Sequence, residues 1–146
     1  MTPTLMGRWQ TRLLLLGTSG LIISALFGVI FGLIFGWTLQ TFLMPLIVLG
    51  YVALFGLFWD ILYQFTLSFR WDQDWPTVFQ VAAGIIEGIL VWLLIHFVGL
   101  PGVDQSLLLS QFIPDYACVW LSIFIISQGP LRVVLPRWRY RGGQWI

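Results

Sequence analysis

Long apolar stretches separated by short polar segments dominate the chain. The first stretch contains no charged residue, and the second and third contain one acid each. A helix needs about 20 apolar residues to cross a bilayer. The pattern therefore predicts an all-α integral membrane protein with four transmembrane helices, at about 13–36, 45–69, 76–98 and 114–135.

Prolines set two of these boundaries. Proline suits the first turn of a helix, so we expect Pro45 to open the second span. The fourth span can be divided in two ways. A helix over about 107–128 would bend at Pro114. Alternatively, 105–112 forms a short interfacial helix and the span begins at Pro114. We favour the second division, because Pro followed by Asp is typical of a helix start.

Composition and charge add orientation to this picture. Hydrophobic residues make up 59% of the chain and charged residues 9%, against about 25% charged in soluble domains. All seven basic residues are arginines. With an inside N-terminus, the amino-terminal segment, the 70–76 loop and the carboxyl tail all lie on one side of the membrane, and that side holds all seven arginines, so we expect both termini to be cytoplasmic. We expect one membrane domain over 1–146, in a bacterial inner membrane, cytoplasmic or photosynthetic.

Small residues recur every four positions along the first span. They are Gly20, Ser24, Gly28, Gly32 and Gly36. In lipid, such rows let helix backbones approach closely, so the sequence predicts a glycine-zipper surface for helix packing. Its partner is either a helix of the same chain or a second chain, in a homo-oligomer or with another membrane protein.

Two acids lie inside the predicted second and third spans. Asp60 and Glu87 are equally far from the centre of the loop that joins these spans, so an antiparallel pair places them at one depth. About ten helical residues, or roughly 15 Å, separate each from the loop. Acids inside a span are costly and are functional candidates. No basic residue is expected at their depth, because Arg8 and Arg12 precede the predicted first span.

Three interpretations of these acids remain open. Tyr63 and Gln64 follow Asp60 on its helical face, and Gln80 lies on the face of Glu87. With no countercharge, at least one acid should hold its proton. The group is then a neutral hydrogen-bonded clamp between two helices, a site for a proton or another cation, or a site for a ligand or lipid substrate.

The carboxyl tail alternates basic and aromatic residues: Arg137, Trp138, Arg139, Tyr140 and Arg141. Basic residues attract anionic headgroups, and Trp and Tyr favour the interface. We therefore expect the 136–146 tail to bind membrane lipids or a partner at the cytoplasmic surface. Three arginines without a folded basic domain do not indicate nucleic-acid binding.

No motif for catalysis, nucleotide binding or metal binding is present, and we expect no enzyme activity, metal or cofactor. The single histidine, His96, could ligate a haem, but no other residue supports one. The sequence favours a small subunit, scaffold or assembly factor that acts by helix packing within a larger membrane complex. The alternative is a proton- or cation-coupled transporter or channel component that uses Asp60 and Glu87.

Overall fold

The computed structural model describes residues 4–69, 77–104, 107, 109–135 and 144. Its elements are α1 (Leu5–Leu15), a π-helical turn η1 (Leu16–Gly20), α2 (Leu21–Phe35), α3 (Leu39–Ser68), α4 (Thr77–Phe97), α5 (Leu109–Gln128) and α6 (Pro130–Val134). No strand occurs in these ranges. Because α1, η1 and α2 are continuous, four helices are long and apolar enough to cross a membrane: Leu5–Phe35, Leu39–Thr66, Val78–Phe97 and Leu109–Gln128. The expectation of an all-helical chain with four such helices is confirmed.

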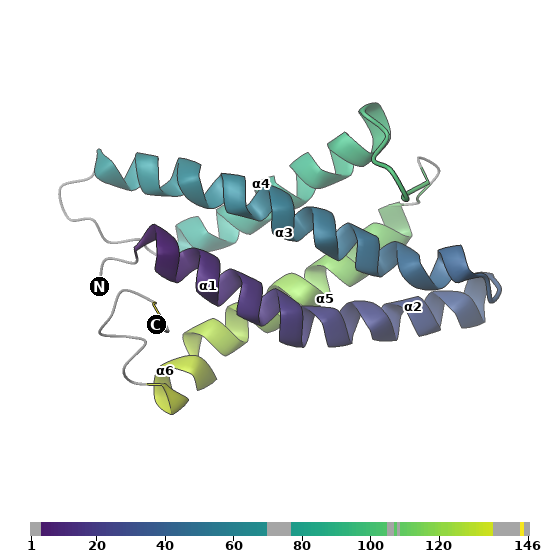
Figure 1. Ribbon diagram of the computed structural model, residues 1–146, viewed down its shortest axis with the longest axis horizontal. Coiled ribbons are helices and arrows are strands. Elements are labelled where there is room, and N and C mark those ends of the chain that lie inside the picture. The colour runs from purple at the N-terminus through teal and green to yellow at the C-terminus, as the bar shows by residue number, and fades with distance from the viewer. Residues whose placement is uncertain (1–3, 70–76, 105–106, 108, 136–143, 145–146) are drawn as a thin grey trace.

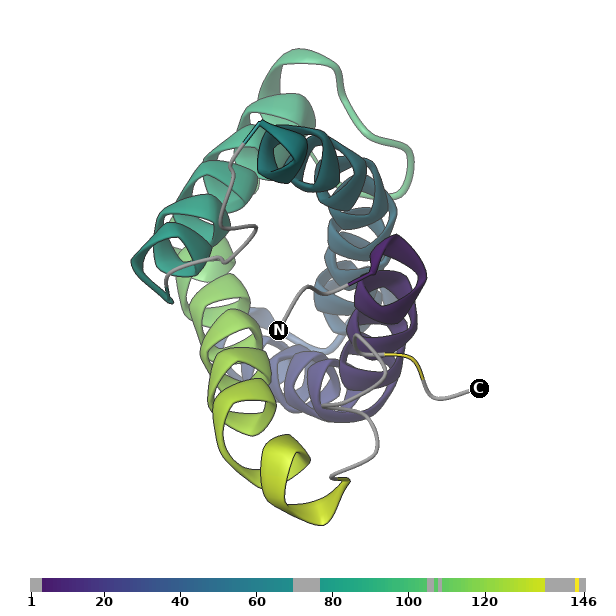
Figure 2. The ribbon, with the colours of Figure 1, turned by 90° about the vertical axis from the view of Figure 1, so that its left-hand side faces the viewer.

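The helices form two layers of antiparallel neighbours. The continuous helix α1–η1–α2 lies beside α3 in one layer, and α4 lies beside α5 in the other (Figures 1 and 2). Seen from one end, the helices surround a common centre (Figure 2). Apolar side chains from all four fill that centre, among them Leu16, Val52, Val91, Ile95 and Val119.

The exterior of the bundle differs from that of a soluble protein. Large apolar side chains such as Leu33, Phe58 and Val78 are exposed, whereas the acids Asp60 and Glu87 are only 4% and 5% exposed. In water, charged residues are almost never fully buried unless they are paired. An apolar exterior around an interior that encloses charged groups fits a bundle that packs against other apolar groups.

The first helix begins eight residues before the predicted start at 13. Thr4 caps α1, since its Oγ1 accepts a hydrogen bond from the Gly7 amide at 3.2 Å. Such a cap satisfies an amide that the first turn leaves without a helical partner. Arg8 and Arg12 therefore lie within the helix instead of in a preceding segment, and this corrects the sequence-based boundary.

The second helix also starts earlier than predicted, at Leu39. The Thr38 hydroxyl accepts a hydrogen bond from the Thr41 amide at 3.1 Å, which is the geometry of an N-terminal cap. Pro45 consequently lies inside α3 and does not open it. Proline there removes one hydrogen bond of the helical ladder, and the residue is buried.

The favoured division of the fourth span is wrong. α5 runs from Leu109 to Gln128 with Pro114 inside it, so the helix does not begin at Pro114. Gly129 then departs from helical geometry (φ −110°, ψ −89°) and separates the short α6, Pro130–Val134, from α5. Residues 105, 106 and 108 of the predicted interfacial helix lie outside the described residues, and 109–112 belong to α5.

Both ends of the described chain lie at the same end of the bundle. The side-chain amide of Gln144 donates a hydrogen bond from Nε2 to the Thr4 hydroxyl at 3.1 Å. The tail residues to which we assigned lipid or partner binding lie outside the described residues: Arg137, Trp138, Arg139, Tyr140 and Arg141. So does the 70–76 loop.

Candidate functional site

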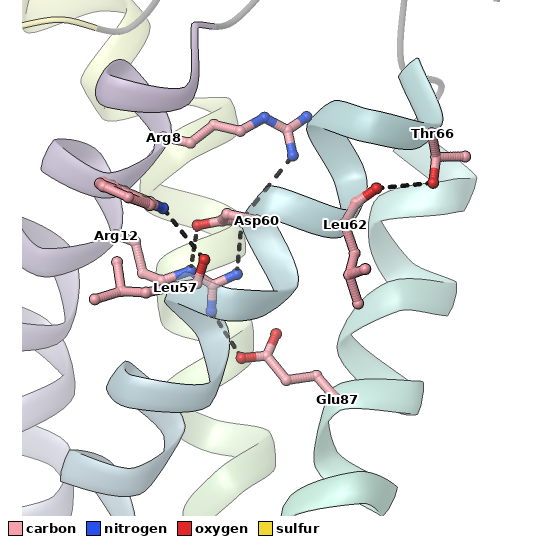
Figure 3. Close-up of polar contacts among 8 residues, drawn as sticks. Arg8, Arg12, Leu57, Asp60, Leu62, Thr66 and Glu87 are labelled. Atoms are coloured by element: carbon pink, nitrogen blue, oxygen red, sulfur yellow. Dashed lines mark hydrogen bonds and ion pairs between the residues drawn. The ribbon is translucent and has the colours of Figure 1, made fainter. Parts of the chain in front are cut away.

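An arginine side chain lies between the two acids that the sequence singles out. Arg12 donates from Nε to Asp60 Oδ2 at 2.9 Å and from Nη2 to Asp60 Oδ1 at 3.2 Å. Its third nitrogen, Nη1, donates to Glu87 Oε1 at 2.7 Å. One guanidinium thus joins α1, α3 and α4, and it reaches across both layers of the bundle (Figure 3). We call Arg12, Asp60 and Glu87 the charge clamp.

This arrangement corrects the expectation that no basic residue reaches the depth of the acids. The planar guanidinium matches a carboxylate with two parallel hydrogen bonds, and Asp60 receives such a pair. Arg12 reaches the acids because α1 begins at Leu5 and carries the side chain into the bundle. Neither acid therefore depends on holding a proton to avoid an unpaired buried charge.

Residues of the first helix surround the clamp. Arg8 lies one turn before Arg12, with its Nη1 4.0 Å from Asp60 Oδ1 and its guanidinium 5.6 Å from the centre of the Tyr63 ring. The indole of Trp9 donates to the Leu57 carbonyl at 3.2 Å (Figure 3). With Arg8 included, two positive and two negative groups face one another, so the cluster is formally neutral.

A glycine makes room for this cluster. A Cβ atom at Gly56 would overlap Nη1 of Arg12, and it would lie 2.7 Å from Arg12 Cζ and 2.8 Å from Glu87 Oε1. Gly56 lies one helical turn before Asp60, on the same face. The guanidinium therefore occupies the space that a side chain at Gly56 would fill.

The other polar residues assigned to this site have different positions. Tyr63 lies under Arg8, as described, and Oε1 of Gln64 is buried without a hydrogen-bond partner in the described structure. Gln80 is directed to another helix, because its Oε1 accepts a hydrogen bond from Gln128 of α5 at 2.9 Å. The structure thus brings Tyr63 to the edge of the clamp and links Gln80 to α5.

Two glycines of the predicted zipper face the start of the second span. A Cβ at Gly28 would lie 2.6 Å from the Phe42 carbonyl oxygen, and a Cβ at Gly32 would lie 3.2 Å from the Trp37 ring. Phe42 belongs to α3, and Trp37 to the turn that precedes it. The neighbours of both glycines are therefore residues of the same chain.

The two earlier members of the row also have neighbours within the chain. A Cβ at Gly20 would lie 3.2 Å from the Leu49 side chain of α3. The Ser24 hydroxyl donates to Asp115 of α5 at 3.2 Å. Four of the five small residues thus pack inside the bundle.

Gly36 does not belong to the zipper. It ends α2 with φ +102°, and a Cβ there would meet nothing within 4 Å. A positive φ is readily adopted only by glycine. Gly36 therefore allows the turn into α3 instead of a close helix contact, which corrects its assignment.

The four-residue spacing of the zipper continues from Gly20 towards the N-terminus, although the residues there are no longer small. Steps of four backwards from Gly20 reach Leu16, Arg12 and Arg8. In a regular α-helix such a row drifts by about 40° per step. The turn η1 contains more residues per turn and moves the row back, so that arginines and glycines face the same interior. This row is the signal that could have placed Arg12 beside the acids.

A second buried polar contact lies further along the same row. Ser24 is fully buried and Asp115 is 4% exposed, and their hydrogen bond joins α2 to α5. Twelve residues separate Ser24 from Arg12, or about 18 Å along the helix. The sequence analysis assigned Asp115 to a helix start and so missed this contact.

His96 has no polar partner in the described structure. Its ring lies 4.3 Å from that of Trp92, and its Nδ1 is buried without a hydrogen bond. No group of three or more His, Cys, Asp or Glu residues in the described ranges could hold a metal ion.

Comparison with known proteins gives no relative from which a role could be transferred. No family model, curated protein or solved structure matches this chain. The function is therefore inferred from the contacts of the charge clamp and of the small-residue row.

Proposed function

We propose that this chain is an integral membrane protein with four spans and both termini in the cytoplasm. The apolar exterior and the paired interior acids support insertion, and the distribution of the seven arginines supports the orientation. The aromatic-rich, lysine-free composition suggests a bacterial inner membrane, cytoplasmic or photosynthetic. Reporter fusions at the two termini and at Gly99 test the orientation; a cytoplasmic signal at Gly99 would contradict it.

We further propose that the protein acts by helix packing, as a small subunit, scaffold or assembly factor of a larger membrane complex. The observation that carries this proposal is the charge clamp. Its guanidinium and both carboxylates bind one another, so the most polar groups of the bundle are used to hold α1, α3 and α4 together. Along all four spans, the described structure exposes large apolar side chains to its surroundings, for example Leu33, Phe58, Ile86 and Leu121.

The alternative, cation handling by Asp60 and Glu87, is less favoured by this geometry. A metal ion at these acids would have to displace the Arg12 guanidinium, which lies within 3.2 Å of both carboxylates, and a proton on either carboxylate would remove the negative charge that pairs with it. Losing that partner would leave buried charge without compensation, at a cost of about 3–5 kcal/mol. We therefore assign the acids to structure and not to transport.

The decisive experiment identifies neighbours in the native membrane. A photo-crosslinking amino acid is placed at one exposed position on each span: Leu33, Phe58, Ile86 and Leu121. We expect at least one position to give a discrete protein adduct, identified by mass spectrometry after purification in mild detergent. Val91, which is fully buried, serves as the control position and should give none.

A second measurement separates the two functions. The purified protein is reconstituted in liposomes, and proton and sodium flux are recorded for the natural chain and for Asp60→Asn. Lipid adducts alone at all four exposed positions, together with flux that Asp60→Asn abolishes, would contradict the packing role and establish the transporter alternative.

A further inference from the structure

Asp115 is the one buried acid in the described part of the chain that has no basic partner. Asp60 and Glu87 each bind Arg12, but no ion pair among the described residues includes Asp115. Its carboxyl is 4% exposed, and its hydrogen bond from the Ser24 hydroxyl is the only one in the described structure. A single neutral donor does not replace the hydration of a carboxylate.

Apart from Asp115, no charged side chain in the ranges that the structure describes lines the hollow beside this residue. From α2 the Ser24 hydroxyl donates its hydrogen bond, and on the side of α3 Asp115 shares a small hollow with Met44, Pro45 and Val48. The polar Gln111, one turn earlier on α5, and the apolar Phe31 are also in this lining.

Other titratable groups on or near these elements contact residues other than Asp115. Tyr116 of α5 donates to the Gly84 carbonyl at 2.7 Å, and His96 of α4 stacks on Trp92. Asp104 is exposed in the connection after α4. The charge clamp is displaced by about 18 Å along the first helix.

We propose that Asp115 is a proton-binding site of the bundle: a carboxylic acid that holds its proton at neutral pH and exchanges it through the hollow beside it. Burial without a countercharge favours the neutral form. The protonated acid keeps the Ser24 contact, because its carbonyl oxygen still accepts that hydrogen bond. The proton is the ligand that fits, since metal ions such as Ca²⁺ or Mg²⁺ need about six or more oxygen ligands.

This inference is independent of the proposed packing role, because it concerns the isolated chain and needs no partner. The test uses purified full-length protein and dicyclohexylcarbodiimide, a reagent that enters apolar regions. The carboxylic acid gives its proton to a nitrogen of the reagent, and its oxygen bonds to the central carbon. The adduct keeps all atoms of both molecules, and peptide mass spectrometry locates it. An ionised carboxylate has no proton to give and does not react in this way.

We expect the adduct on Asp115 and not on Asp60 or Glu87, which the Arg12 guanidinium binds directly. Labelling should fall about tenfold per pH unit once the acid ionises. Asp115→Asn should lose the adduct, whereas Ser24→Ala should keep it. An adduct on Asp60 or Glu87 instead, or labelling that does not change with pH, would overturn the proposal. Protection by sodium ions at constant pH would also overturn it, because it would identify a metal cation as the occupant.

Infrared spectroscopy covers the case in which the reagent does not reach the site. The carbonyl stretch of a protonated acid is compared between the natural protein and Asp115→Asn over the pH range of the labelling. We expect one such band to be lost in the variant. If no band depends on Asp115 at any pH, the proton-binding assignment is wrong.

Discussion

At the scale of single residues, the fold depends on where one guanidinium lies. Arg12 makes three hydrogen bonds to two acids on two other helices, whereas Arg8 approaches Asp60 only at 4.0 Å. A buried charge whose partner is removed is costly, while a complete charged group can be replaced by apolar or neutral residues with little loss. The two arginines therefore form a matched pair for mutation.

Arg12→Met should lower the free energy of unfolding by about 3–5 kcal/mol, because it leaves the buried Glu87 without a cation and Asp60 with only Arg8, at 4.0 Å. Arg8→Met should cost about 1 kcal/mol or less, as for a weak, long ion pair. Unfolding in mixed micelles of detergent and denaturant, followed by circular dichroism, measures both. Adding Asp60→Asn and Glu87→Gln to Arg12→Met should restore most of the loss. Equal effects of the two arginine changes would disprove the charge clamp.

Two glycines of α3 give a second matched pair. Gly56→Ala places a Cβ in the volume of the Arg12 guanidinium, and such overpacking costs about 1–3 kcal/mol. Gly50→Ala, on the same helix, meets nothing within 4 Å and should be neutral or stabilise by up to about 1 kcal/mol through helix propensity. Thermal unfolding in detergent compares them. A loss of stability for Gly50→Ala as large as for Gly56→Ala would contradict this account.

At the scale of elements, the π-helical turn η1 decides which face of the first helix meets the acids. The hydroxyls of Thr18 and Ser19 donate to the Leu14 and Leu15 carbonyls at 2.7 and 2.9 Å, which satisfies carbonyls where the helical ladder changes. The turn keeps Arg12 and the small residues of α2 in one interior row. Such single wide turns occur frequently at functional sites.

Inserting an alanine after Gly17 should lengthen the first helix by one residue next to η1. Gly17 is exposed, and a Cβ added there would meet no atom within 4 Å, so its own side of the helix is not crowded. The insertion rotates Arg12 by about 100° relative to α2 and removes it from Asp60 and Glu87. We expect a loss of stability similar to that of Arg12→Met, measured by the same unfolding experiment.

The double variant provides the control. Once the insertion has broken the clamp, Arg12→Met should cost little more, and the two changes should not add. Fully additive losses would show that η1 and the clamp are independent.

The elements themselves follow from the sequence better than their boundaries do. Long apolar runs, the first uncharged and the others interrupted by single acids, identify all four helices, because few other structures can contain them. The clamp was not predicted because the start of the first helix was placed after the last charged residue, which left Arg8 and Arg12 outside the helix. Thr4 and Thr38 show the missing information, since a polar cap several residues before the apolar run sets where each helix begins.

The pairing of helices is harder to derive from sequence. Equal distance from the loop placed Asp60 and Glu87 at one depth, and the structure does bring both to one guanidinium. Sequence could not show that Gly84 and Gly88 make room for Trp120 and Tyr116 of α5. Those contacts depend on how the two layers are rotated, which a periodic pattern alone does not determine.

At the scale of the whole molecule, the row of small residues faces inward. Gly28→Leu would force a side chain against the Phe42 backbone, where even a Cβ lies 2.6 Å from the carbonyl oxygen. We expect a loss of thermal stability with no change in oligomeric state, measured by light scattering coupled to gel filtration. Gly50→Leu, at an open position, is the control for added bulk. Dissociation of an oligomer by Gly28→Leu at unchanged stability would instead place the row between chains.

The charge clamp also has a consequence for the order of biosynthesis. Arg12 is made 48 residues before Asp60, so the first helix leaves the ribosome with its guanidinium unpaired. An arginine inside a lone span opposes insertion by up to about 2.5–3.5 kcal/mol. We expect a nascent chain truncated after Gly36 to insert poorly, and one truncated after Ser68 to insert well, as glycosylation mapping of translation products can measure. The first helix and α3 would then enter the membrane as a pair. Asp60 of α3 would bind Arg12 and so keep the first helix inserted.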